Sequence, residues 1–149
     1  MIAVVQRVVE AAVTVESQGY EAGIGRGLCV LLAVEKTDGE GDADWMAGKL
    51  ARLRVFPDLK HGMGRSVQDV AGEILLVSQF TLVGDCRKGN RPGFEAAASA
   101  EQARVLIDRV AQQLRAEHDL TVARGVFGAM MQVNIINDGP VTLIVRTSS

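Results

Sequence analysis

The segment Asn137-Asp138-Gly139-Pro140-Val141-Thr142 interrupts a strongly apolar region near the end of this 149-residue chain. The stretches on either side, 130–136 and 141–145, are rich in branched aliphatic residues and read as β-strands. Asn, Asp, Gly and Pro are good turn formers, so the simplest interpretation is a hairpin turn. The segment therefore predicts two strands, near 130–137 and 140–146, that pair with each other.

A second interpretation of the same Gly139-Pro140 pair is functional. Glycine permits unusual backbone angles, proline removes one backbone donor, and the bond between them can be cis. A cis bond can turn both neighbouring carbonyl groups the same way, and two fixed acceptors of this kind can hold an amino group. The segment alone does not distinguish a hairpin turn from a site that holds an amino group.

Another polar segment, Ser78-Gln79-Phe80-Thr81-Leu82, follows the apolar run 73–77. We expect 73–83 to form one buried strand. Buried polar side chains need hydrogen-bond partners, so a strand that ends in them often lines a cleft. The alternative is that Ser78 and Thr81 are ordinary strand hydroxyls that bond to the backbone.

Together with the N-terminal segment 1–8, these two motifs resemble the D-aminoacyl-tRNA deacylase family over nearly the whole chain. The resemblance implies hydrolysis of the ester bond of D-aminoacyl-tRNA, and of glycine mischarged on alanine tRNA, without a metal or cofactor. It places the catalytic set at Ser78, Gln79, Phe80 and Thr81. Backbone groups of Gln79 and Phe80 stabilise the oxyanion. Because a threonine without a base is a weak nucleophile, we favour an orienting role for Thr81.

The resemblance also implies a homodimer with the active site at the subunit interface. Gly139 and Pro140, joined by a cis bond, enter the partner's site from one subunit, contact the amino group and α-carbon of the 3′-terminal aminoacyl group, and exclude L side chains. Arg7 matches an arginine that braces this motif, although a surface arginine is the alternative. Thr142 pins the turn, and Asn137 belongs to the same substrate-binding set.

Length, composition and net charge limit the number of domains, the compartment and the partners of the protein. The length predicts one domain, 1–149, and 48% hydrophobic residues are enough for a core. No apolar run is long enough for a membrane span and no signal peptide is recognisable, so we expect a cytoplasmic protein that does not bind a membrane. The net charge of −2 argues against DNA as a partner. A basic cluster at Arg87, Lys88 and Arg91 either meets phosphate or is a solvated loop.

The fold that these patterns predict is α/β, with a mixed, barrel-like sheet and two main helices packed on one side. Residues 2–15 read as one strand, straight or bent, and 28–34 as a buried central strand. Helical spacing predicts a helix over 42–53, with Trp45 as a core anchor. Ser99, followed three positions later by Gln102, predicts the start of a second helix.

Rival functions remain open. Cys86 and His61 form a conceivable nucleophile pair, because Arg87 and Lys88 would lower the thiol pKa. No His, Cys or carboxylate cluster has metal-ligand spacing. Cys29 lies in an apolar run and reads as a buried side chain, so the two cysteines predict no disulfide framework. The alternative to an enzyme is a non-catalytic dimer of the same fold that binds a D-amino acid or another small molecule.

Overall fold

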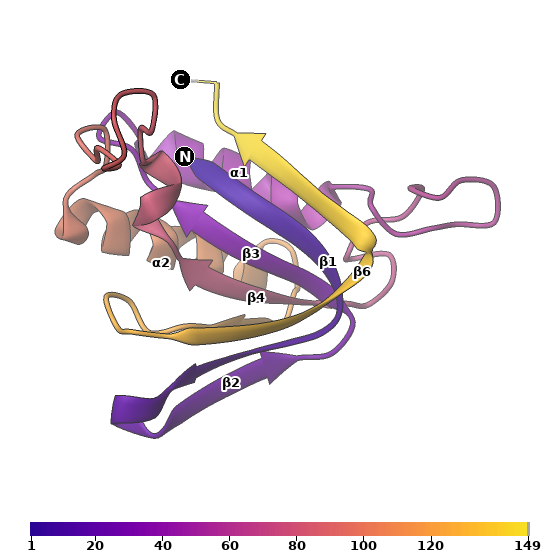
Figure 1. Cartoon of the computed structure of the whole chain (residues 1–149). Coiled ribbons are helices and arrows are strands. Elements are labelled where there is room, and N and C mark those ends of the chain that lie inside the picture. The colour runs from indigo at the N-terminus through magenta and orange to yellow at the C-terminus, as the bar shows by residue number, and fades with distance from the viewer. Residues whose placement is uncertain (149) are drawn as a thin grey trace.

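The computed structural model describes residues 1–148, which form a curled β-sheet with two α-helices (Figure 1). The elements in chain order are β1 (Ile2–Val15), the short 3-10 helix η1 (Glu16–Gln18), β2 (Tyr20–Ile24), β3 (Gly27–Ala33), α1 (Glu40–Arg52), β4 (Glu73–Ser78), the 3-10 helix η2 (Phe80–Val83), α2 (Ala100–Ala116), β5 (Val122–Arg124) and β6 (Gln132–Arg146).

The sheet is mixed and nearly closes on itself. Its path runs β2-β1-β3-β4-β5, with β6 paired to the other edge of β1. Strands β3, β4 and β5 are parallel, whereas β1 is antiparallel to each of its partners. The Tyr20 hydroxyl donates to the Arg124 carbonyl over 2.7 Å, which ties β2 to β5 at the two ends of the path. The predicted barrel-like sheet is confirmed.

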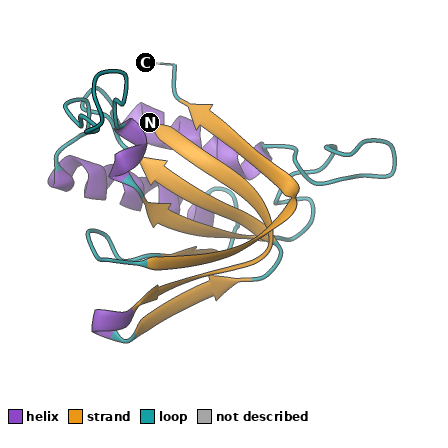
Figure 2. Ribbon diagram, in the orientation of Figure 1, coloured by secondary structure: helices purple, strands orange, loops and turns teal. Residues whose placement is uncertain are grey.

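Both helices cover the same face of the sheet (Figure 2). Alternation along β3 explains this arrangement, because Leu28, Val30 and Leu32 enter the helix-facing core while Cys29 belongs to a second apolar cluster. The second cluster fills the curl between β1, β2, β4 and β6. The prediction of two helices on one side is therefore confirmed.

The helix ends follow the sequence signals, but one helical side chain does not. The Ser99 hydroxyl accepts the backbone N–H of Gln102 over 3.2 Å and caps α2, as predicted. Trp45 is not a core anchor, because it is 42% exposed and Lys49 Nζ lies 5.1 Å from its ring centroid. The apolar face of α1 is filled by smaller neighbours at 43, 46, 47 and 50 instead. None of the helices in residues 1–148 is long and apolar enough to cross a membrane.

Two predicted strand assignments are wrong. The strand expected over 73–83 ends at Ser78, and the chain turns into η2. The hairpin expected at Gly139-Pro140 does not form, because β6 runs continuously through this pair. Both halves of β6 pair with β1 rather than with each other, so the chain continues in one direction through Gly139-Pro140.

The two cysteines differ in environment, which predicts different thiol reactivity. Burial raises the pKa of the Cys29 thiol to about 11, whereas Cys86 is exposed. Because the thiolate is the reactive form, we expect a disulfide reagent at pH 8 to modify one thiol per folded chain and two per unfolded chain. Absorbance of the released thiolate measures both values. Rapid modification of two thiols in the folded protein would contradict this environment for Cys29.

Candidate functional site

The most unusual feature of the sheet is a mismatch between β1 and β6. Val8 pairs with Asn137 and Gln6 pairs with Thr142, so Arg7 alone faces residues 138–141. The Gly139-Pro140 bond inside this bulge is cis, as the family resemblance implies. Proline has no N–H to contribute to a ladder, so a bulge is a site where a strand tolerates it. The bulge leaves Gly139 and Pro140 exposed to solvent.

Arg7 fixes the first half of the bulge. Its Nε donates to the main-chain oxygen of Asp138 over 3.1 Å and lies 3.2 Å from the Asp138 carboxylate. Its Nη1 donates to the carbonyl of Val55 over 2.7 Å. Only 12% of the Arg7 side chain is exposed, so this is a held brace rather than the surface arginine of the alternative interpretation. Its part in substrate binding stays a prediction.

Hydrogen bonds of Asn137 and Thr142 fix the second half of the bulge. The Asn137 side chain accepts the N–H of Val141 over 3.1 Å and donates to the Thr142 hydroxyl over 2.9 Å. Gln6 donates to the same hydroxyl over 3.3 Å. These bonds cross the bulge from one end to the other, so the structure has the pinning contact predicted for Thr142.

Gly139 cannot be replaced without a cost. Its φ of +129° is a conformation that L side chains rarely adopt. A Cβ at this position would lie 2.9 Å from Val141 Cγ2 and 3.1 Å from Arg7 Nη2. The position of the Arg7 guanidinium therefore requires that residue 139 has no side chain.

The 78–82 segment lies at the carboxyl end of β4. Parallel strands β3 and β5 flank β4, and ligands of such sheets bind outside their carboxyl ends. The Gln79 N–H continues the ladder and donates to the Leu32 carbonyl over 2.8 Å. The N–H groups of Phe80 and Thr81 come next, in the first turn of η2, where a helix supplies no partner for them.

The side chains of this segment do not titrate near neutral pH. The Gln79 amide donates to the Thr81 hydroxyl oxygen, which leaves the hydroxyl proton free to donate elsewhere. Phe80 is 58% exposed, and its ring meets the edge of Phe94 with centroids 5.2 Å apart. The segment thus offers backbone donors, one oriented hydroxyl and an aromatic surface.

One chain does not bring the two motifs together. Ser78 lies in one row of the sheet with Leu32, Ala3 and Val145, and Pro140 is five positions from Val145 along β6. At about 3.3 Å per residue along a strand and about 4.8 Å between strands, the motifs are roughly 20 Å apart. A site that uses both needs two copies of the chain.

The rival catalytic pair is also separated. The loop that carries His61 and the loop that carries Cys86 project from opposite ends of the molecule (Figure 1). Asp85 and Arg87 instead form an ion pair at 2.6 Å, and the Arg87 guanidinium lowers the pKa of the Asp85 carboxyl to about 2. Within residues 1–148 no group of three His, Cys, Asp or Glu side chains is placed to hold a metal ion.

Two neighbours of the motifs were not predicted from the sequence. Gln6 contacts Thr142, and Phe94 supports Phe80. The position of Gln6 beside Arg7 was an available signal, because a polar pair inside an apolar strand needs partners. Phe94 follows an irregular loop, so its contact depends on tertiary structure that no local pattern encodes.

Comparison with known proteins gives consistent matches. The family model described as D-Tyr-tRNA(Tyr) deacylase matches residues 4–146. A D-aminoacyl-tRNA deacylase of Heliobacterium modesticaldum is 56% identical, over 98% of this chain and 96% of its own. One of Chlorobaculum parvum is 50% identical, over 99% and 98%. A solved structure titled c-Myc DNA Unwinding Element Binding Protein is 44% identical with a TM-score of 0.91, over the whole of both chains.

The brace on the bulge predicts a change in stability. Arg7→Ala leaves two main-chain carbonyls and a carboxylate without their shared donor, so we expect the free energy of unfolding to fall by about 2 kcal/mol. Urea unfolding followed by circular dichroism measures it. Arg146→Ala, an exposed arginine of the same strand pair, is the control and should change stability by less than about 0.5 kcal/mol. Equal effects of the two variants would show that Arg7 is no brace.

Proposed function

The chain belongs to the D-Tyr-tRNA(Tyr) deacylase family, and from this membership we propose that it hydrolyses the ester bond of D-aminoacyl-tRNA. The products are free tRNA and a D-amino acid. The family match over residues 4–146 carries this conclusion, because it spans both motifs and the sheet that separates them. We expect the enzyme to act in the cytoplasm, where aminoacyl-tRNA is made and used.

The reaction needs little chemical assistance. An ester between an amino acid and a ribose is labile, so its hydrolysis depends on a positioned water and on stabilisation of the oxyanion. The N–H groups of Phe80 and Thr81 at the start of η2 can bind this oxyanion. The N–H of Gln79 is already bonded to Leu32, so Gln79 acts through its side chain, which holds Thr81. The ribose 2′-hydroxyl of the substrate assists the water.

Selection for the D configuration comes from the bulge of a second copy. Gly139 and Pro140 are exposed and held from both ends, so they can present rigid main-chain atoms to the substrate amino group. A pocket closed by these atoms has no room for an L side chain. Rejection by clash discriminates more strongly than attraction alone. Glycine has no side chain to reject, so glycine mischarged on alanine tRNA is accepted.

A homodimer follows from the separation of the motifs. In a symmetric dimer each copy inserts its bulge beside the 78–82 segment of its partner, which gives two equal sites. The surface beside the bulge supports this arrangement. Val9, Ile136 and Ile144 are each at least half exposed, although they are apolar. Val9 and Ile136 lie at one end of the bulge and Ile144 lies beyond the other end, and exposed apolar side chains of this kind occur at contact surfaces.

The function is tested with D-Tyr-tRNA and L-Tyr-tRNA as separate substrates. We expect release of D-tyrosine at a rate at least ~10² times that of L-tyrosine, because the clash acts on the L form alone. Acid precipitation of labelled aminoacyl-tRNA measures both rates. The variant Gly139→Ala should lose D-tyrosine release, since its Cβ displaces the brace. If the wild-type protein binds D-tyrosine but releases neither amino acid, it is the non-catalytic binding dimer.

The role of Thr81 is tested separately. Thr81→Ala removes an orienting hydroxyl but leaves the backbone donors of η2, so we expect kcat to fall roughly tenfold, equivalent to about 1.4 kcal/mol. Thr121→Ala, another exposed threonine, is the matched control and should keep the wild-type rate. Complete loss of turnover in a folded Thr81→Ala protein would instead identify Thr81 as the nucleophile.

A further inference from the structure

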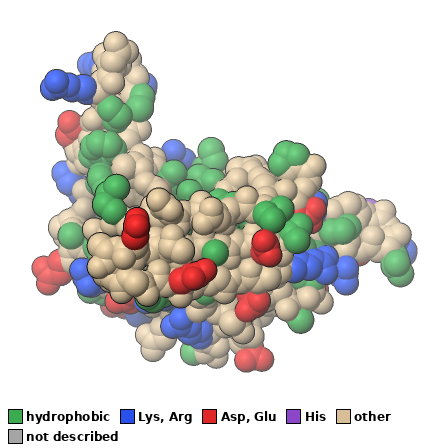
Figure 3. All heavy atoms as spheres, turned by 60° about the horizontal axis from the view of Figure 1, so that its bottom comes forward, with side chains coloured by type: hydrophobic (Ala, Val, Ile, Leu, Met, Phe, Trp, Pro, Cys, Tyr) green, Lys and Arg blue, Asp and Glu red, His purple; other side chains and the backbone are tan. Residues whose placement is uncertain are grey.

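Two basic loops project from the ends of this acidic chain (Figure 3). We call residues 53–65 the distal loop and residues 84–95 the proximal loop, since the latter follows η2. The distal loop carries Arg54, Lys60 and Arg65 against one carboxylate, Asp58. Because the whole chain has a net charge of −2, this loop is a local exception to its surroundings.

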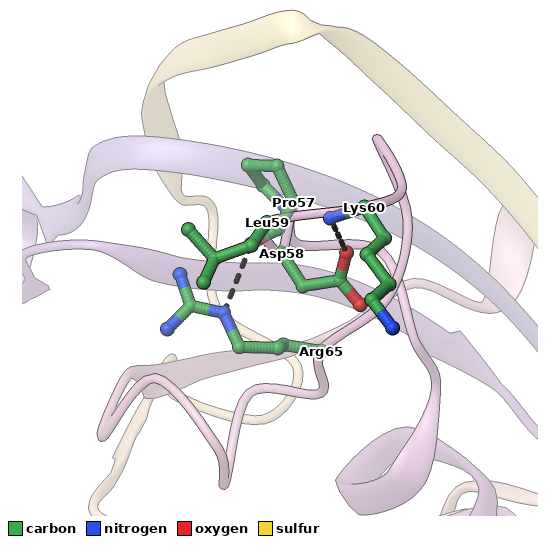
Figure 4. A pocket seen from close by; sticks show the side chains of 5 residues that line it. All are labelled: Pro57, Asp58, Leu59, Lys60 and Arg65. Carbon is green, nitrogen blue, oxygen red and sulfur yellow. Dashed lines mark hydrogen bonds between the residues drawn. The ribbon is translucent and has the colours of Figure 1, made fainter.

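The distal loop is ordered so that its cations face solvent. Arg54 Nε donates to the Gly64 carbonyl over 2.8 Å. Figure 4 shows the second bond, in which Arg65 Nε donates to the Pro57 carbonyl over 2.9 Å. Each guanidinium is thereby fixed, while its terminal nitrogens remain available. Arg54, Lys60 and Arg65 are all exposed, and within residues 1–148 none of them has a carboxylate within 4.0 Å.

The carboxylate of this loop serves the loop itself. Asp58 accepts the backbone N–H groups of His61 and Lys60, and these bonds lower the pKa of its carboxyl. Asp58 Oδ2 also fills the space that a Cβ on Gly64 would need. The Asp58 carboxylate is therefore bonded to the turn, and although the charges of Arg54 and Arg65 also act on Asp58 and Asp69, neither carboxylate lies within 4.0 Å of a basic side chain of this loop.

The proximal loop has the same character on a smaller scale. Arg87 is paired with Asp85, whereas Lys88 and Arg91 are exposed and have no such partner in the described part of the chain. The loop continues from η2, and its Phe94 packs on Phe80. The loop that carries these cations is therefore anchored at η2, whose N–H groups are proposed to bind the oxyanion.

Arg7 ties the distal loop to the bulge. One guanidinium donates to Val55, at the base of the distal loop, and to Asp138, in the bulge. The base of the distal loop and the bulge therefore have a fixed position relative to each other. Within one chain the two basic loops lie at opposite ends (Figures 1 and 3). If the bulge enters the partner's site, Val55 at the base of the distal loop enters with it, which brings this loop toward the partner's proximal loop.

We propose that each active site grips the phosphates of the tRNA acceptor end between the proximal loop of one copy and the distal loop of its partner. This inference rests on the proposed function and extends it to the body of the substrate. Lysine and arginine side chains bind RNA phosphates by neutralising charge and releasing counterions, without reading the base sequence. The grip thus holds any tRNA near its 3′ end.

The phosphate contacts are tested by charge removal. The distal variant is Lys60→Gln/Arg65→Gln, and the proximal variant is Lys88→Gln/Arg91→Gln. For D-Tyr-tRNA at 0.15 M salt, each should raise KM about tenfold and lower the slope of log(kcat/KM) against log salt by about 2. Lys60→Gln alone keeps every side-chain bond of the loop and should lower the slope by about 1. Unchanged KM and slope would overturn the proposal.

Two controls separate this grip from the chemistry. A small ester, D-tyrosyl-adenosine, has no acceptor-stem phosphates, so all three variants should hydrolyse it at the wild-type rate. If the wild-type enzyme hydrolyses neither substrate, the proposed function fails rather than the grip. Lys49→Gln/Arg104→Gln removes two exposed charges from the helices and should leave the salt dependence unchanged.

The shared arrangement has its own test. A heterodimer of one distal-variant copy and one proximal-variant copy, purified through two different tags, has one doubly altered site and one intact site if the loops pair across copies. We then expect half the wild-type kcat with the wild-type KM. If both loops of one copy serve one site, every site carries an altered loop and no wild-type component is seen. That outcome, or a monomeric active enzyme, would overturn the shared grip.

Discussion

The structure depends on a mismatch in residue number between two paired strands. Between the pairs Gln6–Thr142 and Val8–Asn137, β1 has one residue, Arg7, whereas β6 has four, 138–141. A bulge of this size is costly unless its extra backbone groups find partners. Arg7 supplies donors from one side, and the Asn137 side chain supplies both an acceptor and a donor from the other. The long ladder on either side keeps the bulge in register, so the exposed backbone at Gly139 is held from both ends.

The same ladder keeps the two motifs apart. A strand pair that runs the full length of the molecule places the bulge far from the carboxyl end of β4, where Ser78 and η2 lie. A single chain therefore does not bring Gly139 and Pro140 beside its own 78–82 segment. In the proposed homodimer, selection and hydrolysis appear together, because each site takes one motif from each copy.

Local chemistry predicted the elements whose partners are near in sequence or are simply apolar. The run at 28–34, the cap at Ser99 and the bent strand at 2–15 all follow from spacing and side-chain type. It failed at Gly139-Pro140, because turn formers are equally suited to a hairpin and to a bulge, and only the pairing with β1 distinguishes them. The site residues were named from the motifs, but the engagement of the Gln79 N–H by Leu32 depends on a neighbouring strand.

The charge distribution bears on why an acidic protein acts on RNA. A net charge of −2 gives weak long-range attraction to a polyanion, so binding along the body of an arbitrary RNA is not favoured. In the proposed grip, basic side chains concentrated in two short loops confine attraction to the few phosphates that lie near the site. The ester at the 3′ end is the feature common to all aminoacyl-tRNAs, and nothing in its hydrolysis requires the base sequence. The proposed grip on phosphates and the proposed stereochemical wall therefore divide the work: the grip acts on the RNA backbone, and the wall acts on the configuration of the amino acid.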